Sequence, residues 1–158
     1  MHFEHLVDMP LIVKNDLIKM TCGKLIGSGV YRQVYEYKFN EDLVVKIETA
    51  DTKFFANIQE YSVWQEVQDT EFAKYFAPCL AISENGLILI QKRTKPMKKY
   101  PKEIPAFFTD TKLQNYGTIK GQFCCHDYAS HKLYKLGLTK KMIKANWWTV
   151  SAERGTNG

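Results

Sequence analysis

The first part of the chain shows a strand-like pattern of hydrophobic and polar positions, interrupted by a single helical run. Short runs rich in Val, Ile, Leu and Tyr, bounded by Gly, Asn or Asp, predict five strands. These runs are residues 23–37, in which a glycine turn at 27–29 separates two strands, and residues 43–47, 78–83 and 87–91.

The helical run lies between the third and fourth strands. Apolar residues recur at spacings of three and four over residues 54–67, which predicts an amphipathic helix. Glu60 lies beside this apolar stripe. Lys46 is also unusual, because it is a single charge within an apolar strand, where a charge requires a partner.

The second part of the chain has a weaker pattern. Residues 92–105 combine Lys and Arg with Pro, which argues against a long helix there. Residues 115–125 predict a short hairpin around the turn Lys120-Gly121. The apolar residues of the tail favour one helix packed beneath this hairpin; they are Leu133, Leu136, Leu138, Met142, Ile143, Trp147 and Trp148.

Length and composition indicate one ordered domain spanning residues 1–158. Hydrophobic residues make up 45% and aromatic residues 13% of the chain, which is enough apolar material to offset the entropy of ordering it. No run approaches the length of a membrane-spanning helix, and the N-terminus lacks the pattern of a signal peptide, so we expect a soluble protein of the cytoplasm. The spacing of the four cysteines fits neither a disulfide framework nor a zinc site, so we expect reduced thiols.

The formal net charge of +5 comes partly from one basic cluster, which consists of Lys92, Arg93, Lys95, Lys98, Lys99 and Lys102. The cluster fits a solvated loop, and it also fits a surface that attracts phosphates or an acidic partner. Nucleic acid is not the expected partner, because neither zinc-finger spacing nor an aromatic RNA-binding signature accompanies these charges.

Several segments that can carry chemistry follow one another in a fixed order. The turn Gly27-Ser28-Gly29 comes first, then Lys46 on the third strand and Glu60 on the helix. Residues 110–115 then read D-x-K-x-x-N, and an Asp-Tyr-Ala triplet follows at 127–129. In this order the sequence resembles the protein-kinase superfamily over roughly residues 22–130.

The resemblance implies an α+β fold with two lobes. A five-stranded antiparallel sheet with one main helix would form an N-terminal lobe at about residues 20–92, and about residues 93–158 would form a minimal C-terminal lobe. It also implies that the chain binds ATP and Mg²⁺. Phosphoryl transfer depends mainly on positioning and charge neutralisation, which the matched residue types can supply.

For the nucleotide, the resemblance implies one group of contacts in the sheet. The backbone of Gly27, Ser28 and Gly29 would approach the phosphates, because glycine has no Cβ, and Val34 would cover one face of the base. Lys46 would contact the α- and β-phosphates.

Lys46 would be oriented by an acidic residue of the helix. Glu66 competes with Glu60 for this role, and Glu60 is preferred because Tyr61 and Trp64 flank it with core-directed side chains.

For catalysis, the resemblance implies that Asp110 accepts or orients the proton of the acceptor hydroxyl and that Lys112 steadies the charge of the transferred phosphate. Asn115 and Asp127 would bind Mg²⁺ through hard oxygen ligands. Without the resemblance, Asp110 fits the cap of a turn equally well, and Asn115 fits a surface turn.

The sequence also departs from the family. Arg32 stands at the third glycine, where it would stiffen the loop or reach a phosphate. Phe108 and Thr109 replace the usual His and Arg before Asp110, which argues against control by activation-loop phosphorylation. Ala129 replaces the glycine of the Asp-Phe-Gly triplet and should make that triplet harder to switch.

Most of the larger lobe is missing, since about 18 residues separate Gln91 from Asp110. Such economy is what we expect of a virus-encoded kinase relative, for example from a bacteriophage, working in the host cytoplasm. One expected function is an ATP- and Mg-dependent phosphotransferase that acts on protein Ser/Thr or on itself. The other is a catalytically inactive module, a pseudokinase, that binds a host protein through the surfaces left by the missing lobe.

Overall fold

The structure is a computed structural model that describes residues 11–49, 54–129 and 137–150 of the 158-residue chain. Its main feature is a five-stranded sheet with the order β1-β2-β3-β5-β4, in which all neighbours are antiparallel. The strands are β1 (Cys22–Ser28), β2 (Arg32–Tyr37), β3 (Leu43–Glu48), β4 (Cys79–Ile82) and β5 (Ile88–Lys92). The predicted α+β class and the predicted antiparallel sheet are confirmed.

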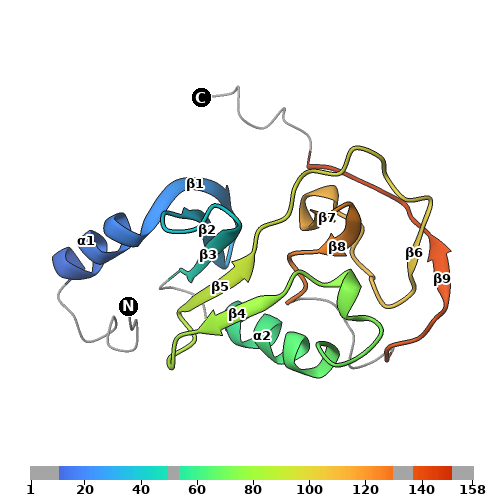
Figure 1. The fold of residues 1–158 in the computed structure, drawn as a ribbon, viewed down its shortest axis with the longest axis horizontal. Coiled ribbons are helices and arrows are strands. Elements are labelled where there is room, and N and C mark those ends of the chain that lie inside the picture. The colour runs from blue at the N-terminus through green and yellow to red at the C-terminus, as the bar shows by residue number, and fades with distance from the viewer. Residues whose placement is uncertain (1–10, 50–53, 130–136, 151–158) are drawn as a thin grey trace.

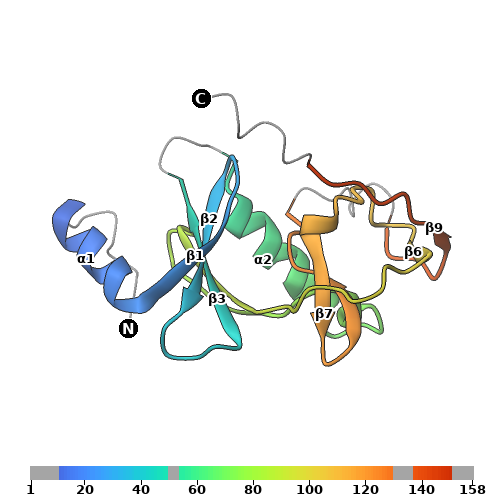
Figure 2. The same cartoon turned by 90° about the horizontal axis from the view of Figure 1, so that it is seen from above.

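The main helix, α2 (Ala56–Val67), lies between β3 and β4 in the chain, as predicted. Figure 2 shows that it lies between the sheet and the β7 region of the second part. Its buried side chains include Asn57, Glu60, Val63 and Val67, which recur every three or four residues and therefore form one face. This face carries two polar residues as well as apolar ones. A short 3₁₀ turn, η1 (Ala73–Tyr75), follows.

The sequence pattern missed α1 (Leu11–Thr21), which precedes β1 without a break. Ile18 of this helix packs against a small cluster of Cys22, Val45 and Ile88 on the sheet. Figure 1 shows α1 at the end of the molecule, beyond the sheet. The helix is therefore an extension of the sheet and lies away from the second part of the chain.

The second part of the chain consists of short elements. A 3₁₀ turn, η2 (Leu113–Asn115), leads into the hairpin of β7 (Tyr116–Ile119) and β8 (Gln122–Cys125), which was predicted. A second pair, β6 (Glu103–Pro105) and β9 (Met142–Lys144), was not predicted. Figure 1 shows this pair at the opposite end of the molecule from α1.

The predicted helix of the tail is wrong for residues 137–150. In this range the chain contains β9, and Ile143 pairs with the buried Ile104 of β6. Gly137 has a φ of +66°, a left-handed conformation that favours glycine and does not continue a right-handed helix. Two of the predicted helix residues, Leu133 and Leu136, lie outside the described residues.

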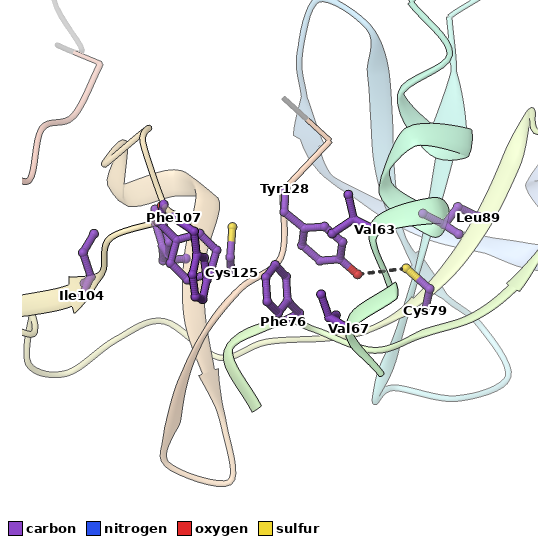
Figure 3. Packing of buried hydrophobic residues seen from close by; sticks show 11 residues of the cluster. Val63, Val67, Phe76, Cys79, Leu89, Ile104, Phe107, Cys125 and Tyr128 are labelled. Carbon is purple, nitrogen blue, oxygen red and sulfur yellow. Dashed lines mark hydrogen bonds between the residues drawn. The ribbon is translucent and has the colours of Figure 1, made fainter. Parts of the chain in front are cut away.

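One hydrophobic core joins the sheet, α2 and the hairpin. Val63 and Val67 of α2 and Leu89 of β5 belong to it together with residues of the second part, and Figure 3 shows Phe76 and Tyr128 at its centre. The rings of Phe76 and Tyr128 meet edge to face, with centroids 5.1 Å apart. Because this core includes residues from both parts, it holds the triplet at 127–129 against α2.

A close backbone contact also joins the two parts. Lys95, which follows the sheet, exchanges two backbone hydrogen bonds of 2.8 Å with Thr118 of β7. A Cβ added to Gly117 would lie 2.6 Å from Thr94 Oγ1 and 2.7 Å from Lys95 O, so glycine is required there. Glycine at 117 thus allows the hairpin to pack directly on the chain that leaves the sheet.

Two further predictions concern cysteines and membranes. All four cysteines are buried and none of them forms a disulfide within the described residues; Cys124 and Cys125 lie in strand β8. Among the described residues, no helix has the length and apolar character needed to span a membrane.

Candidate functional site

A cleft of about 910 Å³ lies between the sheet and the second part of the chain. The glycine turn and β2 line it from the sheet, and the segments 110–116 and 126–129 contribute residues from the other part. All the predicted site residues except Glu60 line this cleft, namely Gly27, Ser28, Gly29, Val34, Lys46, Asp110, Lys112, Asn115 and Asp127. The fold therefore brings together residues that are up to 100 positions apart in the sequence.

Lys46 and Glu60 form the ion pair that the sequence predicted. Lys46 Nζ lies 2.5 Å from Glu60 Oε1, and both side chains are buried. Lys46 also donates a hydrogen bond to the carbonyl oxygen of His126. Glu66, the competing partner, is exposed on the other face of α2. The partner that the charge on β3 requires is thus Glu60.

Glu60 accepts hydrogen bonds from five residues. Two come from Arg32, one each from Lys46 and Gln91, and two from the backbone N–H groups of Tyr128 and Ala129, which makes six in total. Burial alone would raise the pKa of Glu60, but the charges of Arg32 and Lys46 outweigh it and lower the pKa to about 2. Glu60 is therefore ionised and fixes the triplet at 127–129 to helix α2.

Arg32 is the main feature of the site that the sequence did not place. Its guanidinium makes a bidentate contact with the Glu60 carboxylate, in which Nη1 lies 3.1 Å from Oε1 and Nη2 lies 3.1 Å from Oε2. Nη2 also lies 2.8 Å from Asp127 Oδ1. Nη1 also donates to Asn57 Oδ1 at 3.2 Å. Burial opposes the charge of Arg32, but the carboxylates of Glu60 and Asp127 raise its pKa. Arg32 is thus buried, and its ion pairs join β2 to α2 and to Asp127.

Asn57 supports the same cluster and was also missed. Its Nδ2 donates to the carbonyl oxygens of Lys46 and Leu87, while its Oδ1 accepts from Arg32. The sequence signal was present, because Asn57 lies three residues before Glu60 and so shares its face of α2.

The segment after Phe108 forms a turn held by Asp110. Its Oδ1 accepts from the backbone N–H of Lys112 at 3.0 Å, and its Oδ2 accepts from Asn115 Nδ2 at 3.1 Å. The carbonyl oxygen of Asp110 accepts from the hydroxyl of Tyr116. Asp110 therefore caps a turn, as the second interpretation of this residue expected, and it also lines the cleft.

The residues around the turn fit a Mg²⁺ ion. Asn115 uses its amide nitrogen to donate to Asp110, so its amide oxygen is the atom of this side chain that can coordinate a cation. The side chain of Asp127 is 48% exposed, and one of its carboxylate oxygens accepts a hydrogen bond from Arg32. Mg²⁺ prefers a few such oxygen ligands, completed by phosphates and water. No group of three or more His, Cys, Asp or Glu side chains suited to a metal occurs within the described ranges, so the fit rests on Asn115 and Asp127.

His126 links Thr94, which lies in the segment after β5, to the turn at residues 110–115. Its Nε2 lies 2.7 Å from the carbonyl oxygen of Gln114, so this nitrogen carries the proton, and its Nδ1 lies 2.7 Å from Thr94 Oγ1, from which it accepts. Burial and the charge of Lys46 lower the pKa of His126. The neutral ring thus braces one wall of the cleft.

The basic cluster lies partly on this wall. Lys92 and Arg93 line the cleft, and they pair with Asp42 at 3.9 Å and Glu36 at 3.5 Å. The other members of the cluster are exposed, which fits a solvated surface; they are Lys95, Lys98, Lys99 and Lys102.

No family model matches the sequence, and no curated protein is similar to it. Among solved structures, the chain is similar to APH(2")-IIa in its ternary complex with streptomycin and ATP (17% identity, TM-score 0.42) and in its complex with gentamicin (16% identity, TM-score 0.43). Each comparison covers 58% of this chain and 30% of the other. The chain therefore spans less than a third of the length of APH(2")-IIa, and its chemistry is inferred from its own residues.

Proposed function

We propose that the chain is a minimal kinase-like phosphotransferase that uses ATP and Mg²⁺. The observation that carries this proposal is the buried ion pair between Lys46 and Glu60, which opens onto the same cleft as Asp110, Asn115 and Asp127. A buried lysine held by a carboxylate, with oxygen ligands across a cleft, is the arrangement that phosphoryl transfer requires.

The sheet side of the cleft would bind the nucleotide. The glycine turn leaves its backbone accessible to phosphates, and Val34, which pairs in register with Gly27, offers an apolar surface to the base. Lys46 is held in place by Glu60 and would bind the phosphates without reorganising. Arg32 adds a second fixed cation next to it.

The opposite side would carry the reaction. Asp110 would accept the proton of the acceptor hydroxyl, and Lys112 would steady the transferred phosphoryl group. Asn115 and Asp127 would hold Mg²⁺, which supplies charge neutralisation to the phosphates when bound.

One observation favours the second candidate, a binding module without catalysis. Arg32 Nη2 already pairs with Asp127 Oδ1 at 2.8 Å, so a metal ion at Asp127 must share the carboxylate with a buried cation. If that sharing prevents metal binding, the cluster serves stability alone, and the chain acts on a protein partner through its surface.

Nucleotide binding provides the first test of the proposal. ATP with Mg²⁺ should raise the melting temperature, and a hundredfold excess over Kd corresponds to about 2.7 kcal/mol of stabilisation. Lys46→Met removes the charge and retains most of the side-chain volume, so it should abolish most of the shift. Lys24→Met on the exposed part of β1 should leave the shift unchanged. The absence of a shift for the wild type at millimolar ATP would contradict the proposal.

Metal binding can be separated from nucleotide binding at Asp127. Asp127→Asn should remove most of the extra affinity for ATP that Mg²⁺ provides and should change the affinity in EDTA much less. Calorimetric titration with ATP in both conditions measures the two losses, with the exposed Asp69→Asn as a control. Equal losses in the two conditions would show that Asp127 does not hold the metal.

A further inference from the structure

The C-terminal segment of the described chain pairs with the turn that carries Asp110. Trp148 donates its backbone N–H to the carbonyl oxygen of Thr111 at 3.3 Å, and its own carbonyl oxygen accepts from the N–H of Leu113 at 2.9 Å. Thr111 Oγ1 donates to the carbonyl oxygen of Asn146. These bonds bracket Lys112, which forms a parallel bridge with Trp148. The segment is therefore fixed beside the turn on both sides of its central residue.

Side chains reinforce this placement. Lys112 Nζ lies 5.9 Å from the centroid of the Trp148 ring, within the range of a cation–π contact. Trp147 Nε1 donates to the carbonyl oxygen of Pro101 at 2.8 Å, and its ring packs against Tyr116 with centroids 5.2 Å apart. Trp147 and Trp148 thus anchor the segment to two different parts of the chain.

The residue that follows these anchors is Thr149. It is exposed, and it lines the same cleft as Lys46, Asp110, Lys112 and Asp127. Thr149 therefore lines the cleft one residue after Trp148, whose backbone is hydrogen-bonded to both neighbours of Lys112, and it brings a hydroxyl-bearing side chain to the part of the cleft that carries Asp110. Holding an acceptor beside the catalytic group removes most of the entropic cost of bringing them together.

We propose that Thr149 is an acceptor for phosphoryl transfer within the same chain. This inference rests on the proposed phosphotransferase function. A bond forms between Thr149 Oγ and the γ-phosphorus of ATP, and the bond from that phosphorus to the oxygen bridging to the β-phosphate breaks. ADP leaves with the electron pair, and the hydroxyl proton passes to Asp110 and then to water.

The test is to incubate the full chain with ATP and Mg²⁺ and to locate phosphate by peptide mass spectrometry. We expect one phosphoryl group per chain at Thr149, formed with a first-order rate constant that does not change on dilution of the protein. Thr149→Val should abolish incorporation and Thr149→Ser should retain it. Thr139→Val, at an exposed threonine that does not line the cleft, should have no effect.

A mixing experiment tests whether the transfer occurs within one chain. Asp110→Asn protein supplies Thr149 without the base, and Thr149→Val protein supplies the base without the acceptor. No label should appear on the Asp110→Asn chain in the mixture. Label there, or label at Ser151 or another residue of the wild type, would overturn the assignment while leaving the phosphotransferase function intact.

The remaining outcomes separate the two proposals. If the wild type binds ATP and transfers phosphate to added protein, alcohol or water but never to itself, the inference on Thr149 is overturned and the proposed function stands. If ATP neither binds nor is consumed, both are overturned.

Discussion

Replacing Glu60 by glutamine should lower the free energy of unfolding by about 3–5 kcal/mol, the range expected when one partner of a buried ion pair is removed. The carboxylate accepts six hydrogen bonds and is the shared counter-charge of Arg32 and Lys46. Glutamine keeps the shape but supplies a single acceptor oxygen, and its NH₂ group would face other donors. Urea denaturation followed by circular dichroism measures the loss.

The control for this prediction lies on the same helix. Glu66→Gln changes an exposed residue of α2 and should alter the stability by less than about 0.5 kcal/mol. A loss below about 1 kcal/mol for Glu60→Gln would mean that the cluster does not hold the sheet and the second part together.

The same pair of proteins gives a pH dependence with a defined sign. The pKa of Glu60 is about 2 in the folded chain, against an ordinary value of 4.5, so the unfolded chain takes up the proton first as the pH falls. The contribution of the ionised carboxylate is therefore complete above about pH 4.5 and is lost as the pH falls toward 2. The stability difference between wild type and Glu60→Gln should shrink over that range. A difference that grows on acidification would contradict the assigned charge state.

The sheet and main helix could be predicted because each has a local signature. The short runs of Val, Ile, Leu and Tyr in β2, β3 and β5, the spacing of three and four in α2, and the turn residues between them are all visible within short windows. The pair of β6 and β9 could not be predicted, since each strand has three residues, and its register depends on Ile104 and Ile143 meeting across almost forty positions.

The part of the site that could be predicted is the part whose residues follow one another along the chain in the order typical of the protein-kinase superfamily. Lys46 was visible as a charge in an apolar strand, and its partner could be narrowed to two glutamates of one helix. The pairing of Arg32 was not visible, because its partners lie 28 and 95 positions away, on α2 and after β8.

The tail shows why a stripe of apolar residues is not enough to define a helix. Trp147 and Trp148 were expected to belong to one helix with the other apolar residues of the tail. In the structure they lie on an extended segment, where Trp147 packs against Tyr116 and Trp148 is 49% exposed beside Lys112. The deciding contacts are backbone hydrogen bonds to the turn at residues 111–113, which no local pattern of the tail encodes.

The change that should separate an enzyme from a binding module is Asp110→Asn. Asparagine is nearly isosteric, and its side-chain oxygen can still accept from the N–H of Lys112, so the turn should form although the hydrogen bond from Asn115 Nδ2 is lost. The base for the acceptor hydroxyl is lost, and turnover should fall by the 10²–10⁴-fold typical of losing general base assistance. The ATP-induced rise in melting temperature should stay nearly the same, because Asp110 acts on the acceptor and not on the bound nucleotide.

The measurement combines two readouts on the same protein: ADP release with all acceptors present, including the chain itself, and the thermal shift with ATP and Mg²⁺. The exposed Asp69→Asn serves as the control and should change neither. A variant that loses the thermal shift together with turnover would place Asp110 in nucleotide binding. Unchanged turnover would remove Asp110 from the reaction. If the wild type binds ATP but releases no ADP, the phosphotransferase proposal is wrong, and the binding module, with Arg32 holding Asp127 away from the metal, is the function that the site supports.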